Sequence, residues 1–526
     1  MNEKKHYDVV IVGGGILGCS IAYLLSYNLG SGVRILLIEQ ESSPAFHASS
    51  RNTGKVHAPF LYDPSKRKLF ARSASLGFDM LSDYCQARDL PFIKDGVLEV
   101  ATEEDGIPHL HRYLEWGYSN GLHHDELRYL DRNEVSTLEP NVRCKGAIHC
   151  TRDASVSYGK IASSLLTDAR NLGCEVMFAT KVVSLKSREY SYSDKSYEKR
   201  EQGSTDNQHN HVIRLKLVQT YQVPSLSSPP PPTALPSGVR TGSFNCPIVD
   251  SFIKHLPSAK QMQSVSELST NYLINVAGGG ALHLAQAMGF ARAYAVLHFR
   301  GEYWVAPPFL RDLTKMSIYS VPKYPEYPFL DPHWVVRIDG RREVGPNALL
   351  VSGPFAYDWH QNMRLVLPKI MQSIRASGRL GLATLFSDKI FLSLVLHEFR
   401  SSLSKRVMIN RARRFLPALD PSQFTIRGTS GIRSSLVDEN GKFVPDIIII
   451  GDEDSLHILN YNSPGATGAL PIAGLIVDRV MKLGKFRNSE HTRNAEKGVL
   501  SIGLTPVTNW DIRHISEYLT EKHSRS

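Results

Sequence analysis

Hydrophobic residues near the N-terminus form two short continuous runs separated by a segment of small side chains. Residues 7–12 (YDVVIV) and 33–39 (VRILLIE) are β-branched and apolar, which is typical of strands buried on both faces. Between these runs, residues 19–29 combine small and apolar side chains and predict a helix. The three segments together predict a β-α-β unit of about 33 residues.

Further along the chain, the same kinds of pattern predict additional helices and strands. Pro108 stands in the first turn of one predicted helix, where its missing N–H does no harm, and Ser157 is placed to cap another. The predicted helices cover residues 108–120, 158–172, 281–288, 386–415 and 470–483. The predicted strands cover residues 175–185 (a pair), 271–276, 292–306 and the buried run 446–450.

Residues 186–265 differ in composition from the rest of the chain. Residues 187–211 are polar, and residues 224–260 include Pro229–Pro232, a run that cannot join the interior of a helix or a sheet. Residues 212–223 have the pattern of a strand. We therefore expect an insertion that is largely disordered, with two such segments flanking one hairpin strand.

Composition and charge are those of a globular protein with a basic excess. The 526 residues are 42% hydrophobic and 21% charged, and the formal net charge is +10. The densest basic segment, residues 400–414, interleaves Lys and Arg with apolar side chains, which favours a solvated helix face over a nucleic-acid surface. No nucleic-acid partner is therefore predicted.

The cysteines and the N-terminal residues bear on the cellular compartment. Six cysteines without a CxxC pair indicate free thiols in a reducing compartment and predict no metal site. Residues 1–6 have neither the apolar core of a secretory signal nor the features of an Arg-rich presequence. A run of about 18 apolar residues is missing, so no transmembrane segment is predicted. We expect a cytoplasmic protein, although a processed mitochondrial precursor would have the same pattern.

The turn between the first strand and the first helix carries Gly13, Gly15 and Gly18 in the spacing GxGxxG. The first glycine permits a tight turn, the second admits a pyrophosphate to the backbone, and the third lets helix and strand pack closely. The helix N-terminus adds N–H donors and a positive dipole end. Glu39 ends the second strand, where a carboxylate binds an adenosine ribose hydroxyl. The pattern predicts dinucleotide binding, and an acid at this place argues against NADP.

A polar, glycine-bearing loop, residues 49–57 (SSRNTGKVH), follows the second strand. In a dinucleotide fold, this loop lies where the pyrophosphate and the ring of a bound flavin would be. A solvent loop with capping Ser and Asn side chains is the alternative interpretation.

Together, the segments VVIVGGGILG and SSRNTGKVHAPFLYDPSKRKLFAR resemble the D-amino-acid-oxidase-like flavoenzyme superfamily, and within it the L-2-hydroxyglutarate dehydrogenases. Residues 299–303 (FRGEY), 344–348 (VGPNA) and 456–467 (LHILNYNSPGAT) resemble further blocks of that family and follow in the same order. The departures beside the motif histidine are Lys55, Pro59 and Phe60. These departures leave the substrate open, and they do not affect the expected fold.

The resemblance implies FAD as the cofactor and an α/β fold, in which a Rossmann-like FAD-binding domain is interleaved with an antiparallel-sheet α+β substrate domain. The expected FAD-binding domain comprises residues 1–90, 151–185, 266–290 and 421–485. The expected substrate domain comprises residues 91–150 and 291–420, with an insertion at 186–265 and a C-terminal tail at 486–526. The residues expected to contact FAD are Gly13, Gly15, Gly18, Glu39, Ser50, Asn52, Thr53, Gly54, Val183, Gly278, Asn462, Ser463, Gly465, Ala466 and Thr467.

Four residues are candidates for catalysis. His57 is expected to take the hydroxyl proton of a 2-hydroxyacid, because imidazole titrates near the working pH; a structural, flavin-contacting or flavin-linked histidine is the alternative. Arg433 matches an arginine with which members of the superfamily hold a substrate carboxylate through two parallel bonds, and a surface ion pair is its alternative. Arg300 and Tyr303 are candidates for the same pocket, although strict strand alternation places them on opposite faces.

These observations predict an FAD-dependent oxidoreductase acting on a small carboxylate substrate, an L-2-hydroxyacid such as L-2-hydroxyglutarate, by hydride transfer to flavin N5. Quinone, another acceptor or oxygen then takes the electrons. One alternative is an amino-acid oxidase or a glycerol-3-phosphate dehydrogenase of the same superfamily. A second alternative is a flavin-binding protein without turnover. Bleaching of the flavin by substrate separates the enzymes from the last alternative.

Overall fold

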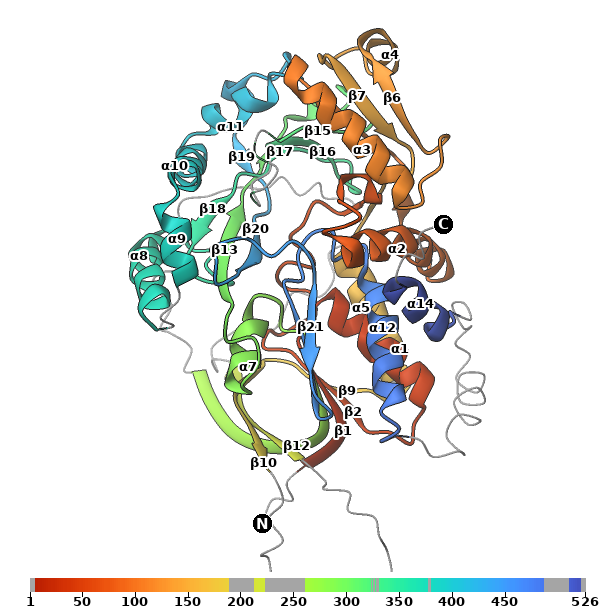
Figure 1. Cartoon of the computed structure of the whole chain (residues 1–526), viewed down its shortest axis with the longest axis vertical. Helices are drawn as coiled ribbons and strands as arrows, with labels where there is room; N and C mark the ends of the chain where they lie inside the picture. Colours follow the sequence, from red (N-terminus) through yellow and green to blue (C-terminus); the bar gives the residue numbers. More distant parts are fainter. Residues whose placement is uncertain are drawn as a thin grey trace, which may run out of the picture.

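The computed structural model describes the greater part of the residues of the chain. These are residues 5–188, 212–222, 261–322, 324, 327, 331–376, 380–486 and 510–521. One large sheet lies toward the bottom of Figure 1, and a second large sheet lies toward the top.

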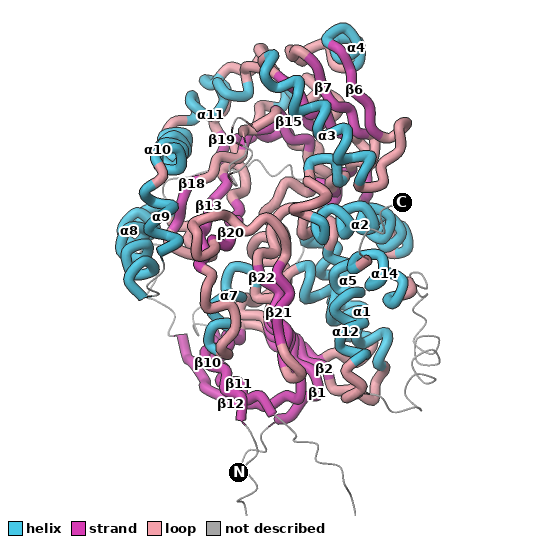
Figure 2. Tube along the Cα trace, viewed as in Figure 1, coloured by secondary structure: helices cyan, strands magenta, loops and turns pink. Residues whose placement is uncertain are grey.

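The first sheet has a parallel centre extended by antiparallel strands on one side. The strand order is β10-β11-β12-β1-β2-β9, and β22 joins β12 and β21 beside this path (Figure 2). The pairs β12–β1, β1–β2, β2–β9 and β12–β22 are parallel. The strands are β1 (Lys5–Val12), β2 (Ile35–Ile38), β9 (Glu175–Met177), β10 (Thr180–Arg188), β11 (Val212–Gln222), β12 (Gln261–Asn275), β21 (Ile448–Gly451) and β22 (Ser455–Leu459).

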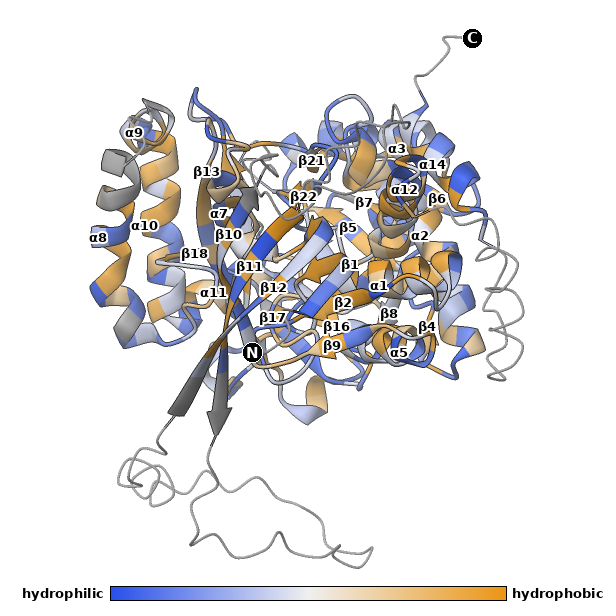
Figure 3. Ribbon diagram, turned by 90° about the horizontal axis from the view of Figure 1, so that it is seen from below, coloured by the Kyte–Doolittle hydropathy of each residue, from blue (hydrophilic) through white to orange (hydrophobic). Residues whose placement is uncertain are grey.

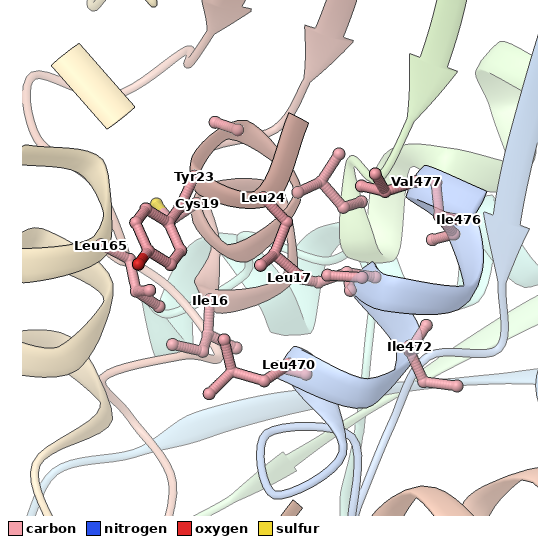
Figure 4. Packing of buried hydrophobic residues seen from close by; sticks show 14 of the residues in the cluster. Ile16, Leu17, Cys19, Tyr23, Leu24, Leu165, Leu470, Ile472, Ile476 and Val477 are labelled. Carbon is pink, nitrogen blue, oxygen red and sulfur yellow. The ribbon is translucent and has the colours of Figure 1, made fainter. Parts of the chain in front are cut away.

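Three helices pack together over this sheet and form the largest hydrophobic core. They are α1 (Ile16–Leu29), α5 (Tyr158–Asn171) and α12 (Ala469–Lys482), and α1 contacts both of the others. Leu17, Leu24 and Leu470 belong to this core (Figure 4), where full burial of each such side chain contributes about 1.5–3 kcal/mol. Two further helices, α2 (Lys68–Ala87) and α14 (Ile512–Thr520), pack on α12.

The second large sheet is antiparallel except for the parallel pair β15–β5. Its order is β19-β14-β17-β16-β15-β5-β7-β6, and it has α3 (Ile107–Ser119) on one face and α11 (Lys405–Ala412) on the other. The strands are β5 (Val97–Ala101), β6 (Leu127–Asp131), β7 (Gly146–Cys150), β14 (Trp304–Val305), β15 (Ser317–Ser320), β16 (His333–Val336), β17 (Arg342–Gly345) and β19 (Ile426–Arg427).

Smaller elements join the two sheets. One three-stranded sheet has the order β18-β13-β20, and the other has the order β3-β8-β4. Their strands are β3 (Lys55–Val56), β4 (Phe92–Ile93), β8 (Ala154–Val156), β13 (Ala295–Gly301), β18 (Leu349–Val351) and β20 (Gly431–Val437). The remaining helices are α4 (Arg132–Leu138), α7 (Ala281–Ala287), α8 (Trp359–Ala376), α9 (Leu380–Ser387) and α10 (Lys389–Leu403). Helices α8 and α10 lie at one side of the molecule and carry both apolar and polar residues (Figure 3).

Most of the predicted elements are confirmed. The first β-α-β unit, both early helices with Ser157 as a cap that accepts from the Lys160 N–H, and the strand at 212–222 form as expected. Cys144 and Cys150 are free thiols, as expected. No helix among the described residues is both long and apolar enough to cross a membrane. Most of the expected insertion lies outside the described residues.

Three expectations are corrected. The run at 446–450 is not a buried strand, because β21 is half-buried and pairs antiparallel with β22. The buried parallel strand is β22. Its polar residues Ser455 and His457 interrupt the hydrophobic run from which a buried strand would be predicted. Strand β12 begins at Gln261, ten residues before the predicted run at 271, and the expected C-terminal tail contains α14.

Candidate active site

The backbone angles and close contacts at the GxGxxG turn show which of its three positions require glycine. Gly13 has φ +116°, and a Cβ there would lie 2.5 Å from the carbonyl oxygen of Val276. A Cβ at Gly18 would overlap the carbonyl oxygen of Gly13. At Gly15, by contrast, the nearest atom to an added Cβ is the Ser49 hydroxyl, at 3.1 Å. The first and third glycines are therefore needed because backbone atoms lie too close for a side chain, whereas at the second the close neighbour is a side-chain hydroxyl.

The N-terminus of α1 and the end of β2 meet at this turn. Gly15 is the N-cap of α1 and makes no side-chain cap hydrogen bond, and the N–H of Ile16 donates to the Ser49 hydroxyl at 2.9 Å. The Glu39 carboxylate accepts from the N–H of Gly14 at 2.6 Å and from the N–H of Glu41 at 2.9 Å. Burial raises the pKa of Glu39, and the two backbone donors oppose that rise.

This arrangement fits the adenosine and pyrophosphate part of FAD. A helix N-terminus that begins at a glycine supplies N–H donors for phosphate oxygens, and the Ser49 hydroxyl that accepts from Ile16 lies beside them. Glu39 is held rigidly at the edge of the turn, as required for a carboxylate that accepts from ribose hydroxyls.

The polar loop after β2 is held by its own side chains. The Asn52 amide donates to the carbonyl oxygens of Ala48 and Ser49, and its oxygen accepts from the N–H of Gly54 at 2.9 Å. Gly54 has φ +74°, in the left-handed region that favours glycine. This turn leads directly into β3 and His57.

Two loops that are far apart in the sequence meet beside His57. The backbone N–H of His57 donates to the Thr467 hydroxyl at 3.1 Å. The same hydroxyl lies 3.0 Å from the hydroxyl of Tyr158, which also donates to the carbonyl oxygen of Lys55. In the second loop, the Tyr461 hydroxyl donates to the carbonyl oxygen of Gly465 at 2.5 Å. The structure thus brings together the predicted loops at 49–57 and 462–467.

Buried titratable groups surround the His57 imidazole. Its Nδ1 lies 3.4 Å from a carboxylate oxygen of Asp153, and its ring lies 5.8 Å from the Tyr319 ring. The Tyr319 ring lies 4.2 Å from that of His333. Among the described residues, neither the Tyr319 hydroxyl nor His333 Nδ1 has a hydrogen-bond partner. Burial lowers the pKa of His333 to about 3 and raises that of Tyr319 well above its usual value.

Arg433 lies on β20, directly opposite Phe299 of β13. Burial lowers the pKa of Arg433, the positive charge of Arg67 lowers it further, and Tyr303 and Tyr62 oppose this effect. Tyr303 is buried, and burial raises its pKa to about 12. The electrostatic influence of Arg433 extends to His333, whose pKa it also lowers. Arg433 thus contributes positive charge to the region that contains Tyr303 and His333.

Arg300 is held by protein groups. Its guanidinium donates to the Glu302 carboxylate at 2.8 Å and to the carbonyl oxygen of Tyr357 at 2.8 Å. The Asn347 amide in turn donates to Glu302 at 2.9 Å. This network joins the two sequence blocks FRGEY and VGPNA. Tyr303 takes no part in this network and packs in the same hydrophobic cluster as Tyr319, beneath α3.

The two remaining predicted cofactor residues lie on the first sheet and at its edge. Val183 is 46% exposed and sits at an irregularity in the pairing of β10 with β11. Gly278 follows β12 and has φ +54°. Sequence reasoning did not single out Asp153, Tyr319 or His333, and it noted Lys55 only as a departure. Lys55 is buried and donates to Asp95 at 2.6 Å.

Comparisons with known proteins identify similar FAD-dependent oxidoreductases. The sequence model of the DAO family, described as FAD dependent oxidoreductase, matches residues 8–213. A human protein named L-2-hydroxyglutarate dehydrogenase, mitochondrial, is 27% identical over 485 residues, covering 91% of this chain and 90% of that protein. The L-2-hydroxyglutarate dehydrogenase of Salmonella houtenae is 26% identical over 494 residues, covering 94% of this chain and 98% of that protein.

Solved structures of two oxidases share the fold. L-alpha-glycerophosphate oxidase from Mycoplasma pneumoniae, solved with FAD bound, superimposes with a TM-score of 0.58 at 18% identity, covering 91% of this chain and 94% of that chain. Glycine oxidase from Geobacillus kaustophilus superimposes with a TM-score of 0.56 at 16% identity, covering 91% and 95%. The DAO-type FAD-binding fold expected from the sequence is confirmed.

Proposed function

Since this chain is an FAD-dependent oxidoreductase with a DAO-family domain, we propose that it oxidises a small L-2-hydroxycarboxylate, with L-2-hydroxyglutarate as the first candidate. The observation that carries the proposal is a group of basic and hydroxyl side chains linked by ring contacts and charge, in which Tyr303, Tyr319 and His333 are buried and His57 and Arg433 are half-buried. The names of the curated relatives support the same substrate class.

In this proposal, Arg433 binds the carboxylate next to the reacting carbon. A guanidinium makes two parallel charge-assisted bonds to a carboxylate and so fixes both its position and its orientation. Tyr303, whose electrostatic influence on Arg433 is favourable, lines the same site. Arg300 is held by Glu302 and the carbonyl oxygen of Tyr357, on the strand that pairs with the Arg433 strand.

His57 takes the hydroxyl proton of the substrate. The histidine is fixed through its backbone by Thr467 and has an imidazole nitrogen near Asp153. Proton transfer to a positioned histidine contributes typically 10²- to 10⁴-fold to a rate. Bound FAD supplies the two-electron oxidant, and the chain's residues orient the substrate and hold the proton.

We assign FAD binding to the residues around the glycine turn and the two loops. Glu39 would hold the ribose, and Gly13, Gly15 and Gly18 would shape the turn around the pyrophosphate. The other proposed contacts are Ser50, Asn52, Thr53, Gly54, Val183, Gly278, Asn462, Ser463, Gly465, Ala466 and Thr467. The sheet that contains β1 would belong to the FAD-binding domain. The eight-stranded sheet that contains β5 would belong to an interleaved substrate domain, with the boundaries predicted from the sequence.

The test is the visible spectrum of the purified protein under anaerobic conditions. Flavin absorbs near roughly 450 nm, and this band is expected to bleach on addition of L-2-hydroxyglutarate and to persist with D-2-hydroxyglutarate. A band that bleaches only with an amino acid or glycerol 3-phosphate would replace the proposed substrate with that compound. A band that no small carboxylate or phosphate bleaches would favour a flavin-binding protein without turnover.

A further inference from the structure

Asp153 lies in the turn that joins β7 to β8, and this turn separates two charges. Its neighbour Arg152 pairs with Asp79 at 2.6 Å and with Glu126 at 3.1 Å, both near the surface. Asp153 is fully buried, and its backbone carbonyl accepts from the N–H of Gly96 at 3.1 Å. The turn therefore directs one charged side chain outward and one carboxylate inward.

The Asp153 carboxylate lies among aromatic side chains and has one basic neighbour within ion-pair distance in the described structure. That neighbour is His57, whose Nδ1 lies 3.4 Å from Asp153 Oδ2. Among the described residues, neither oxygen of Asp153 has a hydrogen-bond partner. The negative charge on Asp153, after burial, helps to raise the pKa of the Tyr319 hydroxyl.

A carboxylate in such surroundings is costly unless a donor satisfies it. Burying an unpaired charge is among the most unfavourable changes in a protein interior, and a partner must compensate it. The 3.4 Å separation is longer than a charge-assisted hydrogen bond of about 2.7–2.9 Å. Catalytic hydrogen bonds are often long before substrate binds and tighten in the substrate complex.

The other neighbours of His57 cannot supply a negative charge. His333 is buried and uncharged near neutral pH, because burial lowers its pKa to about 3. The Tyr319 hydroxyl stays protonated, because burial raises its pKa. Among the described residues, Asp153 is therefore the carboxylate that lies within ion-pair distance of this imidazole.

We propose that Asp153 is the positioning residue of His57, accepting the Nδ1–H so that the Nε2 lone pair is free to receive a proton. This inference rests on the proposed role of His57 as a base. When the substrate O–H bond breaks, its proton goes to Nε2, and the resulting imidazolium is stabilised by the carboxylate. An aspartate that fixes the tautomer of a catalytic histidine has a known parallel in hydrolytic triads.

The variant Asp153→Asn tests this assignment in the FAD-loaded protein. An amide can donate to Nδ1 and so stabilise the opposite tautomer, a change that lowers kcat by about 10⁴-fold in a serine protease triad. We expect kcat to fall by at least about 10²-fold. We expect KM to change by less than about threefold, because the carboxylate-binding residues are intact.

A spectroscopic readout does not depend on turnover. In protein labelled with ¹⁵N-histidine, the His57 signals, assigned by their loss in His57→Gln, are expected to report the Nδ1–H tautomer. In Asp153→Asn they are expected to lose that preference. A kcat within about threefold of wild type, or an unchanged tautomer, would overturn the proposal.

Asp168→Asn is the matched control. Asp168 is also a buried carboxylate, but it is bonded to the Tyr84 hydroxyl at 2.8 Å and to Arg88 at 2.9 Å, in α5. Its loss is expected to lower Tm without changing kcat or the His57 signals. If wild-type protein fails to oxidise L-2-hydroxyglutarate, the proposed substrate is wrong, and the tautomer measurement still decides the role of Asp153.

Discussion

Lys55 and Asp95 form a buried ion pair. We predict that breaking this pair destabilises the protein more than breaking an exposed pair does. The Lys55 side chain is 0% exposed, the Asp95 side chain is 9% exposed, and their charged atoms lie 2.6 Å apart. The Ser155 hydroxyl donates to the same carboxylate oxygen at 2.7 Å. Asp95→Asn leaves the ammonium of Lys55 buried and unpaired.

Breaking a buried pair by removing one partner typically costs about 3–5 kcal/mol, because the remaining charge is uncompensated. We expect Asp95→Asn to destabilise the protein by an amount in this range, with a fall in Tm of at least roughly 5 °C. Lys55→Met should cost a similar amount. The double variant Lys55→Met/Asp95→Asn should recover most of the loss, since replacing both charges of a buried pair is often close to neutral.

Differential scanning fluorimetry and urea unfolding of the four proteins complete a double-mutant cycle. The control is Glu104→Gln, which removes the exposed pair Lys145–Glu104, whose side chains are 44% and 77% exposed. That change should cost less than about 1 kcal/mol. Two results would refute the reasoning: an Asp95→Asn loss no larger than that of Glu104→Gln, or a double variant whose loss equals the sum of the single losses.

Three further outcomes are expected. Gly18→Ala should yield protein with little FAD, measured as the ratio of flavin to protein absorbance, because its Cβ would overlap the Gly13 carbonyl; full occupancy would contradict the proposed turn. Arg433→Lys should raise KM for the 2-hydroxycarboxylate by about 10²-fold or more with a smaller change in kcat, because the two-pronged contact is lost; an unchanged KM in steady-state assays would remove Arg433 from the substrate site. The pKa of buried His298 is lowered from 6.5 to about 3, so its contribution to stability is present above 6.5 and is lost as pH falls toward 3; His298→Gln should therefore flatten the fall of Tm with acid, and an unchanged slope would contradict this.

The sequence predicts the part of the site that is built from local residues. The glycines and Glu39 lie within one β-α-β unit, where spacing alone determines which atoms meet. Asp153, Tyr319 and His333 could not be predicted. Strand pairings across the sheet that contains β5, together with the β7–β8 turn, bring them close to one another. Local residue spacing cannot predict contacts between segments that are so far apart in the sequence.

Two elements show why patterns mislead in particular places. Helix α8 is outside the predicted elements and contains Pro368 in its interior, where proline normally interrupts a helix. The alternation argument for Arg300 and Tyr303 did not apply, because β13 ends at Gly301, between the two residues. Arg300 therefore pairs with Glu302, whereas Tyr303 joins the core of the other sheet.

The contact between His57 and Thr467 spans 410 positions of the chain, and it has a consequence for synthesis on the ribosome. The loop beside His57 and helix α12, which covers α1, emerge only after nearly the whole polypeptide has been translated. Until α12 is synthesised, one side of α1 in the early β-α-β unit stays uncovered. Folding that depends on such long-range contacts is slow, and the exposed apolar surface favours aggregation. We therefore expect FAD to bind only after α12 has been synthesised, because the proposed cofactor loop at 462–467 precedes that helix directly.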